Sequence, residues 1–328
     1  MCIRDRFTDV LQTHLLDEAP EKAPTLHRRA SVWYERNEQP AAAIRHAFAA
    51  EDFVRAADLI ERAWRTMDAN LQSRRWFKWA QGLPDEAVRL RPVLCIGCAW
   101  ALLNEGNLEA ADEWLRTAEA LLDPAPADAI PMQPDAVAVA DEKEFRKLPA
   151  TIASARAYLA QARGDAAASV TYAQAALSRL PADDHGGRAV PGAILGLTYW
   201  ANGELEAAHR ALSESMADFR RTGNVVAAIS GTYGLADIRI AQGRLHAALR
   251  TYEEALQLAL AQGQPVPLGT ADLYLGLSGL YRELGDAAVA AENLQRSKEL
   301  GEQAALPDWP QRMRVVQARL KVDQGDLD

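Results

Sequence analysis

The sequence GRLHAALRTYEEAL, at residues 243–256, contains the pattern on which the fold depends. Gly243 stands between two helical patterns. Glycine reaches positive φ without a side-chain clash, so it can end one helix and let the chain reverse. After it, apolar residues return at helical spacing, among them Leu245, Ala248 and Tyr252. The stretch predicts a turn followed by an amphipathic helix, whose apolar face needs a partner.

The same turn recurs along the chain. Its glycines are Gly106, Gly164, Gly203, Gly243, Gly285 and Gly325, at successive spacings of 58, 39, 40, 42 and 40 residues. One helical hairpin cannot bury both of its faces, so a regular repeat of this length indicates hairpins that stack on one another. Abundant alanine and leucine, both strong helix formers, favour the same fold. We predict an all-α protein.

The charge of the chain restricts its partners. The 328 residues have a formal net charge of −9. Residues 1–80 hold 13 Lys or Arg against 12 Asp or Glu, so the acidic excess lies in the remainder. An acidic surface repels phosphate backbones, and we expect no direct binding of nucleic acid by this chain. The basic and aromatic run RRWFKW at 74–79 could suggest the opposite. Because Trp76, Trp79 and Leu83 share one helical face, a helix with core tryptophans is the favoured interpretation.

No residue pattern indicates catalysis or metal binding. The three cysteines, Cys2, Cys95 and Cys98, are too few and too unevenly placed for a disulfide framework. Cys95 and Cys98 have CxxC spacing, but a structural zinc site needs four ligands and no second pair is near, so core packing is favoured. The histidines are dispersed, and we predict no metal, no catalytic residues and no enzyme activity. No window approaches the ~20 apolar residues that cross a bilayer, and we expect a cytoplasmic protein.

The repeat resembles the tetratricopeptide repeat (TPR). That repeat has glycine at the turn, alanine five residues later and an aromatic residue or leucine four beyond that. Gly243, Ala248 and Tyr252 fit the pattern well, although the period here is longer than usual. The resemblance implies a tetratricopeptide-like solenoid of helical hairpins, wound as a right-handed superhelix.

A second resemblance concerns the first third of the chain. The segments LHRRASVWY at 26–34, AIRHA at 43–47 and DF at 52–53 resemble the middle of the MalT-type large LuxR-family transcriptional regulators. Trp79, Arg91 and Trp100 are similar to the start of that family's repeat domain. In such regulators a P-loop module and a winged-helix segment precede the repeats, and a helix-turn-helix follows them. The repeat domain receives an inducer, and ATP-dependent oligomerisation then activates transcription.

This sequence departs from that plan at both ends. The motif GxxxxGK(S/T) is absent, so ATP is expected only in a module outside this chain, and no basic recognition helix follows Gly325. Prolines interrupt any long helix in the first half of 123–149. The implied organisation is a leader and winged-helix remnant at 1–24, hairpins at 25–122, a Pro-rich loop insertion at 123–149 and repeats at 150–328, truncated at the C-terminus.

Candidate ligand-binding residues follow from the resemblance to the tetratricopeptide repeat. There, the first helix of each hairpin lines the concave surface, and the positions six and three before the turn glycine point into it. These positions hold Trp100 and Leu103, Tyr158 and Gln161, Leu197 and Trp200, Asp237 and Ile240, and Gly279 and Arg282. Apolar area with a few polar groups suits a small molecule or a peptide. The predicted site is therefore Trp100, Tyr158, Gln161, Trp200, Asp237 and Arg282, with core packing the favoured alternative for each.

Two functions remain open. The leading hypothesis is the sensor and interaction domain of a MalT-like LuxR-family regulator, a fragment without its P-loop and DNA-binding parts. It would bind a small-molecule inducer or a regulatory protein, together with the other modules of the same regulator. The alternative is a freestanding TPR scaffold for protein–protein interaction.

Overall fold

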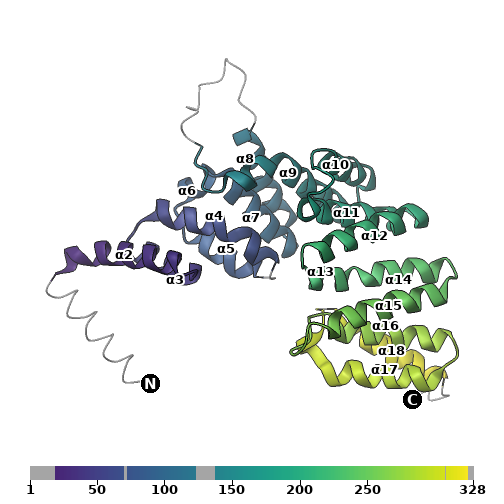
Figure 1. The fold of residues 1–328 in the computed structure, drawn as a ribbon. Coiled ribbons are helices and arrows are strands. Elements are labelled where there is room, and N and C mark those ends of the chain that lie inside the picture. The colour runs from purple at the N-terminus through teal and green to yellow at the C-terminus, as the bar shows by residue number, and fades with distance from the viewer. Residues whose placement is uncertain (1–18, 70–71, 123–136, 307, 324–328) are drawn as a thin grey trace, which may run out of the picture. The chain divides into compact units, whose positions relative to one another are not determined.

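The computed structural model describes residues 19–69, 72–122, 137–306 and 308–323, and every regular element in these ranges is helical (Figure 1). The predicted all-α, tetratricopeptide-like class is confirmed. The described residues fall into two compact units, which divide between residues 155 and 156. Gly325, residues 1–18 of the predicted leader and residues 123–136 of the predicted loop lie outside the described residues.

The first unit consists of successive helical hairpins. Its elements are η1 (Pro20–Lys22), α2 (Ala23–Arg36), α3 (Pro40–Ala49), α4 (Phe53–Ala69), α5 (Ser73–Gln81), α6 (Asp85–Arg89), α7 (Pro92–Asn104), α8 (Leu108–Leu122) and the first part of α9 (Glu142–Ala162). Pro40 and Pro92 begin their helices, because the first helical position has no intrahelical acceptor for an amide hydrogen. Two turns use glutamate instead of glycine, with φ of 55° at Glu38 and 53° at Glu51.

The aromatic run at 74–79 lies on α5, and its central tryptophan belongs to the core. Trp76 is fully buried, and its indole Nε1 donates a hydrogen bond to the Ile60 carbonyl at 2.8 Å. Cys95 and Cys98 on α7 are also buried. Burial raises the pKa of the Cys95 thiol to about 12, so its thiolate is scarce at neutral pH. The core-packing interpretation is confirmed for Trp76 and both cysteines.

The predicted loop at 123–149 is too long at its C-terminal end, because α9 already begins at Glu142. Two carboxylates explain why α9 begins before position 149, because they accept backbone amide hydrogens at its N-terminus. Glu61 accepts the amides of Ala140 and Asp141 at 2.8 and 2.9 Å, and Asp141 accepts the amide of Glu144 at 3.1 Å. Pro149 lies within the helix, where it removes only one backbone hydrogen bond. Through the amides of Ala140 and Asp141, Glu61 holds the start of α9 against α4. Arg91 forms an ion pair with the same buried carboxylate at 3.1 Å.

The second unit repeats the hairpin several times. After the end of α9 come α10 (Ala166–Ser178), α11 (His185–Ala201), α12 (Leu205–Arg221), α13 (Val225–Ser230), α14 (Thr232–Ala241), α15 (Leu245–Leu260), α16 (Thr270–Glu283), α17 (Ala287–Leu300), the 3-10 turn η3 (Gly301–Ala304) and α18 (Trp309–Asp323). The pairs α11 with α12, α14 with α15 and α16 with α17 are antiparallel hairpins (Figure 1).

The predicted turn glycines within the described residues all have a left-handed backbone. Their φ values are 77° at Gly106, 79° at Gly164, 80° at Gly203, 71° at Gly243 and 82° at Gly285. Aspartate caps two of the helices that follow: Asp165 accepts the amide of Ala168, and Asp286 that of Val289. Another turn of this type, missed in the sequence, lies at Gly223, with φ of 75°.

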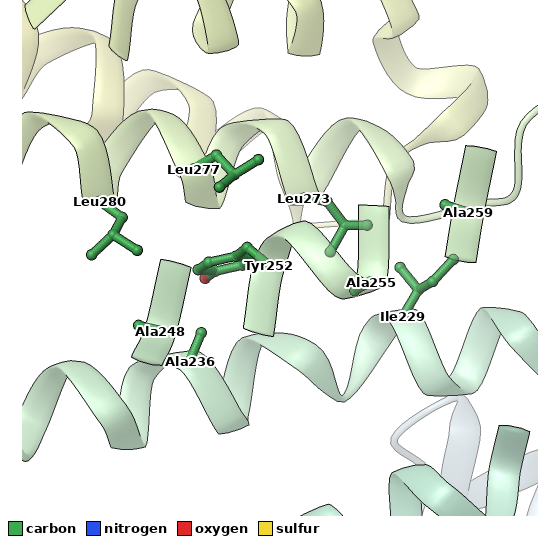
Figure 2. Packing of buried hydrophobic residues seen from close by; sticks show 9 residues of the cluster. All are labelled: Ile229, Ala236, Ala248, Tyr252, Ala255, Ala259, Leu273, Leu277 and Leu280. Atoms are coloured by element: carbon green, nitrogen blue, oxygen red, sulfur yellow. The ribbon is translucent and has the colours of Figure 1, made fainter. Parts of the chain in front are cut away.

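Tyr252 is the central side chain of one inter-hairpin core. It comes from α15 and is 2% exposed. In Figure 2 its ring lies between Ala236 of α14 on one side and Leu277 and Leu280 of α16 on the other. A Cβ at Gly276 would come within 2.4 Å of this ring, so glycine is required for α16 to approach so closely. The aromatic residue of the repeat therefore packs against the next hairpin and stabilises the contact between the two.

Candidate functional site

The second unit contains a cavity of about 510 Å³. Its walls come mainly from α14, α16 and α18, which belong to successive hairpins, with Tyr252 of α15 at the base. The lining residues are Tyr233, Asp237 and Ile240 of α14, Leu275, Gly276, Gly279, Leu280 and Glu283 of α16, and Gln311, Arg312, Val315, Val316 and Arg319 of α18. Sites for small molecules are typically of this size, mostly apolar, with a few polar groups that orient the ligand.

Helical spacing places the lining residues of α14 on one stripe. Tyr233, Asp237 and Ile240 lie at i, i+4 and i+7, so all three project from the same face of the helix. Gly279 of α16 faces them across open space, because a Cβ built there would meet no atom within 4 Å. The cavity therefore owes part of its volume to a missing side chain.

Arg312 is the most strongly bound charge in the cavity wall. Its guanidinium forms ion pairs with the buried carboxylate of Asp272 and with Asp308. The guanidinium carbon also lies over the Tyr233 ring, 4.3 Å from the ring centroid, which is a cation–π geometry. The charge of Arg312 is thus already compensated by protein groups.

Asp237 has the opposite character. No hydrogen bond or ion pair to its carboxylate occurs among the described residues, although it is only partly exposed. Burial raises the pKa of this carboxyl, and the nearby Arg312 charge opposes that shift. A desolvated carboxylate without a close partner is costly to the folded protein, and such groups gather at functional sites.

Tyr233 adds a second polar atom of this kind. Its hydroxyl is buried and no hydrogen bond of ordinary geometry reaches it within the described part of the chain, although the nearby Arg312 guanidinium, which lies over the ring, favours its ionised form. Burial raises the pKa of Tyr233 well above its usual range, so the phenol is neutral. Its ring packs edge-on to Tyr252 with centroids 5.7 Å apart.

The sequence-predicted site residues do not form one group. Asp237 lines the cavity, and so do Ile240 and Gly279 from the same predicted positions. Arg282 lies outside it and forms ion pairs with Glu283 and Asp323. The remaining candidates lie outside the cavity: Trp100 is buried in α7, Tyr158 is half-buried on α9, Gln161 donates a hydrogen bond to Thr198 at 3.4 Å, and Trp200 packs against the core formed by α12 and α14.

Tyr233 and Arg312 are the functional candidates that sequence reasoning missed. Tyr233 precedes Asp237 by one helical turn, so a search extended along the same face would have found it. Arg312 lies on α18, after which the expected turn glycine is Gly325, and the six-and-three rule does not select position 312.

The described residues form neither a candidate metal site nor a candidate membrane span. In these ranges no group of three or more His, Cys, Asp or Glu side chains has a geometry that could hold a metal ion. No described helix combines the length and the apolar character needed to cross a bilayer.

Fold and sequence pattern together define a tetratricopeptide-like helical repeat protein. The chain belongs to the family described as the MalT-like TPR region, whose profile matches residues 150–328. The HTH-type transcriptional regulator MalT of Serratia proteamaculans is 26% identical over 264 residues, which are 80% of this chain and 27% of that protein. The serine/threonine-protein kinase PknK of Mycobacterium tuberculosis is 34% identical over 95 residues, 29% of this chain and 9% of the kinase. The chain thus spans less than a third of either relative.

Solved structures with the same fold include sensor and repeat proteins. A signal transduction ATPase with numerous domains (STAND) from Pyrococcus horikoshii, which has a tetratricopeptide repeat sensor, matches with a TM-score of 0.65 and 14% identity over 90% of this chain and 41% of that chain. The apo form of RapI matches with a TM-score of 0.56 and 11% identity over 90% of this chain and 81% of its own. At these identities the likeness shows the fold alone.

Proposed function

We propose that this chain is the effector-sensing region of a MalT-like, LuxR-family regulator of transcription that acts in the cytoplasm. The observation that carries the proposal is the cavity between α14, α16 and α18, which lies within the segment that matches the MalT-like family. The relatives support it. MalT of Serratia proteamaculans is an HTH-type transcriptional regulator, and the Pyrococcus horikoshii protein carries its repeats as a sensor.

The placement of the cavity suggests how binding is transmitted. A ligand in it contacts first helices of successive hairpins, whose spacing sets the pitch of the repeat array. A ligand that fits one spacing better than another shifts the population towards it. In the proposed regulator, the ATP-binding and DNA-binding modules of the same protein respond to that shift. A cavity of this size favours a small molecule over a regulatory protein as the effector.

The intact gene provides the first test. We expect one reading frame that encodes a GxxxxGK(S/T) motif before this segment and a helix-turn-helix after it. A frame with neither would contradict the proposal and favour a freestanding TPR scaffold.

Transcript profiling provides the second test. Gly279→Leu fills the cavity without meeting another atom at its Cβ, whereas Ala318→Leu adds the same side chain at an exposed position of α18 outside the cavity. We expect the strain carrying Gly279→Leu to lose its response to the inducing condition and the strain carrying Ala318→Leu to retain it. A deletion strain with an unchanged transcriptome would overturn the proposal.

A further inference from the structure

We propose that the cavity binds a small molecule with a protonated amine on an apolar body, and that Asp237 receives the ammonium group. This inference deepens the proposed function and rests on it only for what the binding is used for.

The balance of charge around the cavity selects a cation. The charge of Arg312 acts on the Asp237 carboxyl, but this guanidinium is shared between Asp272 and Asp308. Glu283 is paired with Arg282, and Arg319, which also lines the cavity, is exposed, so water screens its charge. Among the lining groups that are shielded from water, the carboxylate of Asp237 is therefore the charge without an ion-pair partner.

The hydrogen-bonding groups agree with this assignment. An ammonium group has only donors, and three of them. Asp237 offers acceptor oxygens without a partner among the described residues, and the Tyr233 hydroxyl one helical turn away is buried and unsatisfied there. A neutral phenol oxygen can accept one donor while the carboxylate accepts another. An anionic ligand could accept a hydrogen bond from the Tyr233 hydroxyl, but it would leave the Asp237 carboxylate unsatisfied and face it with a like charge.

The rest of the lining explains the apolar body. Ile240, Leu275, Val315 and Val316 supply aliphatic surface, and the space above Gly279 leaves room for a ring. Burial of apolar surface supplies affinity, and the single charged contact supplies orientation. We infer an aromatic or branched aliphatic amine as the ligand class.

Three probes of the same shape separate the possible ligand charges. Tryptamine, tryptophol and indole-3-propionate share the indole ring and a two-carbon arm, which ends in an ammonium, a hydroxyl or a carboxylate group. Binding to the 328-residue chain is measured by isothermal titration calorimetry at pH 7.5. We expect tryptamine to bind about tenfold more tightly than tryptophol, the effect of one charge-assisted hydrogen bond, and indole-3-propionate to bind most weakly.

Three variants locate the site. Asp237→Asn keeps the shape of the side chain and is expected to reduce the preference for tryptamine over tryptophol to less than about twofold. Glu254→Gln removes a carboxylate from the exposed face of α15 and should keep the full preference. Gly279→Leu should abolish binding of all three probes. Circular dichroism confirms that each variant is folded.

Several results would overturn the inference. They are tightest binding by indole-3-propionate, an unchanged preference in Asp237→Asn, or no binding of any probe at millimolar concentration to the folded chain. These outcomes would contradict the ligand class without deciding whether the chain belongs to a transcriptional regulator. Amine binding by a chain whose gene lacks both flanking modules would leave the inference intact and remove only the regulatory role.

Discussion

The carboxylate of Asp272 on α16, whose side chain is fully buried, binds the guanidinium of Arg312 on α18. The same carboxylate accepts the amide hydrogen of Leu306 at 2.8 Å, so it also fixes the segment that leads into α18. Burial raises the pKa of this carboxyl, and the contacts with Leu306 and Arg312 oppose the rise because they stabilise the carboxylate, whereas Asp237 lacks close partners of this kind among the described residues. The pair of Asp272 and Arg312 thereby positions one wall of the cavity.

Removing the charge of Asp272 should destabilise the second unit. We expect Asp272→Asn to lower the free energy of unfolding by about 2 kcal/mol, because it weakens a charge-assisted hydrogen bond and leaves Arg312 with less compensation. Asp308→Asn is the matched control. Its side chain is 62% exposed, and its ion pair with the same arginine should contribute less than about 1 kcal/mol. Urea denaturation followed by circular dichroism measures both; equal losses would contradict the argument.

Asp237→Asn should have the opposite sign. Burial raises the pKa of the Asp237 carboxyl above 3.8, so the folded state binds its proton more tightly than the unfolded chain does. Stability therefore decreases as pH rises from about 3.8 through the raised pKa, and the reduction persists at neutral pH. We expect the variant to melt at a higher temperature than the wild type at pH 7.5, with the difference disappearing at the acidic end of this window.

Glu254→Gln serves as the control for that measurement, since its carboxylate is exposed and should not change the melting temperature. The charged groups that line the same cavity stay in place in both variants: Arg312 and Arg319 on α18 and Glu283 on α16. A lower melting temperature for Asp237→Asn at pH 7.5 would show that the carboxylate is stabilising and has a partner. A destabilising group kept at a binding site is the usual compromise between stability and function.

Two glycines three residues apart on α16 give a matched pair. A Cβ at Gly276 would come within 2.4 Å of the Tyr252 ring, whereas one at Gly279 meets nothing within 4 Å. We expect Gly276→Ala to destabilise the protein by about 1–3 kcal/mol through overpacking. Gly279→Ala should stabilise it by about 0.5–1 kcal/mol, because alanine is the better helix former. Thermal melts of both variants decide the matter, and similar melting temperatures would exclude the close contact with Tyr252.

The sequence allowed the repeat to be predicted because glycine performs a backbone role that few residues can replace. Gly203 and Gly243 have φ of 80° and 71°, as a helix-ending turn requires. The same reasoning missed Gly223, because it had assigned residues 203 to 243 to a single period. It also extended the Pro-rich loop to position 149. The contacts of Glu61 that fix the start of α9 join positions about eighty residues apart, so no local pattern in the sequence indicates them.

The candidate site was predicted only in part, for a physical reason. A periodic rule finds residues that one helix presents on one face, and so it selected Asp237, Ile240 and Gly279. A cavity also depends on which side chains of other helices neutralise its charges. The pairing of Arg312 with Asp272, forty residues apart in the chain, leaves Asp237 without a close partner, and no local pattern reveals it.

In the first unit, two histidines should make the hairpin of α2 and α3 sensitive to acid. The Nδ1 atoms of His27 and His46 lie 2.9 Å apart, so one ring donates a hydrogen bond to the other, and the His46 ring stacks on Tyr34 with centroids 5.2 Å apart. The pKa of His46 is lowered from 6.5, first by burial and then by the charges of His27 and Arg45. As pH falls below about 6.5 the unfolded chain takes up the proton first, so stability declines with acidification and is fully present above that pH.

Hydrogen–deuterium exchange at several pH values tests this dependence. After correction for intrinsic exchange rates, we expect peptides from residues 23–49 to lose protection as the pH falls below about 6.5, while peptides from α16 and α17, which contain no histidine, keep theirs. His27→Gln removes one like charge and should make the change smaller, because only burial and Arg45 then lower the pKa of His46. The idea fails if both regions respond alike, or if His27→Gln leaves the pH profile unaltered.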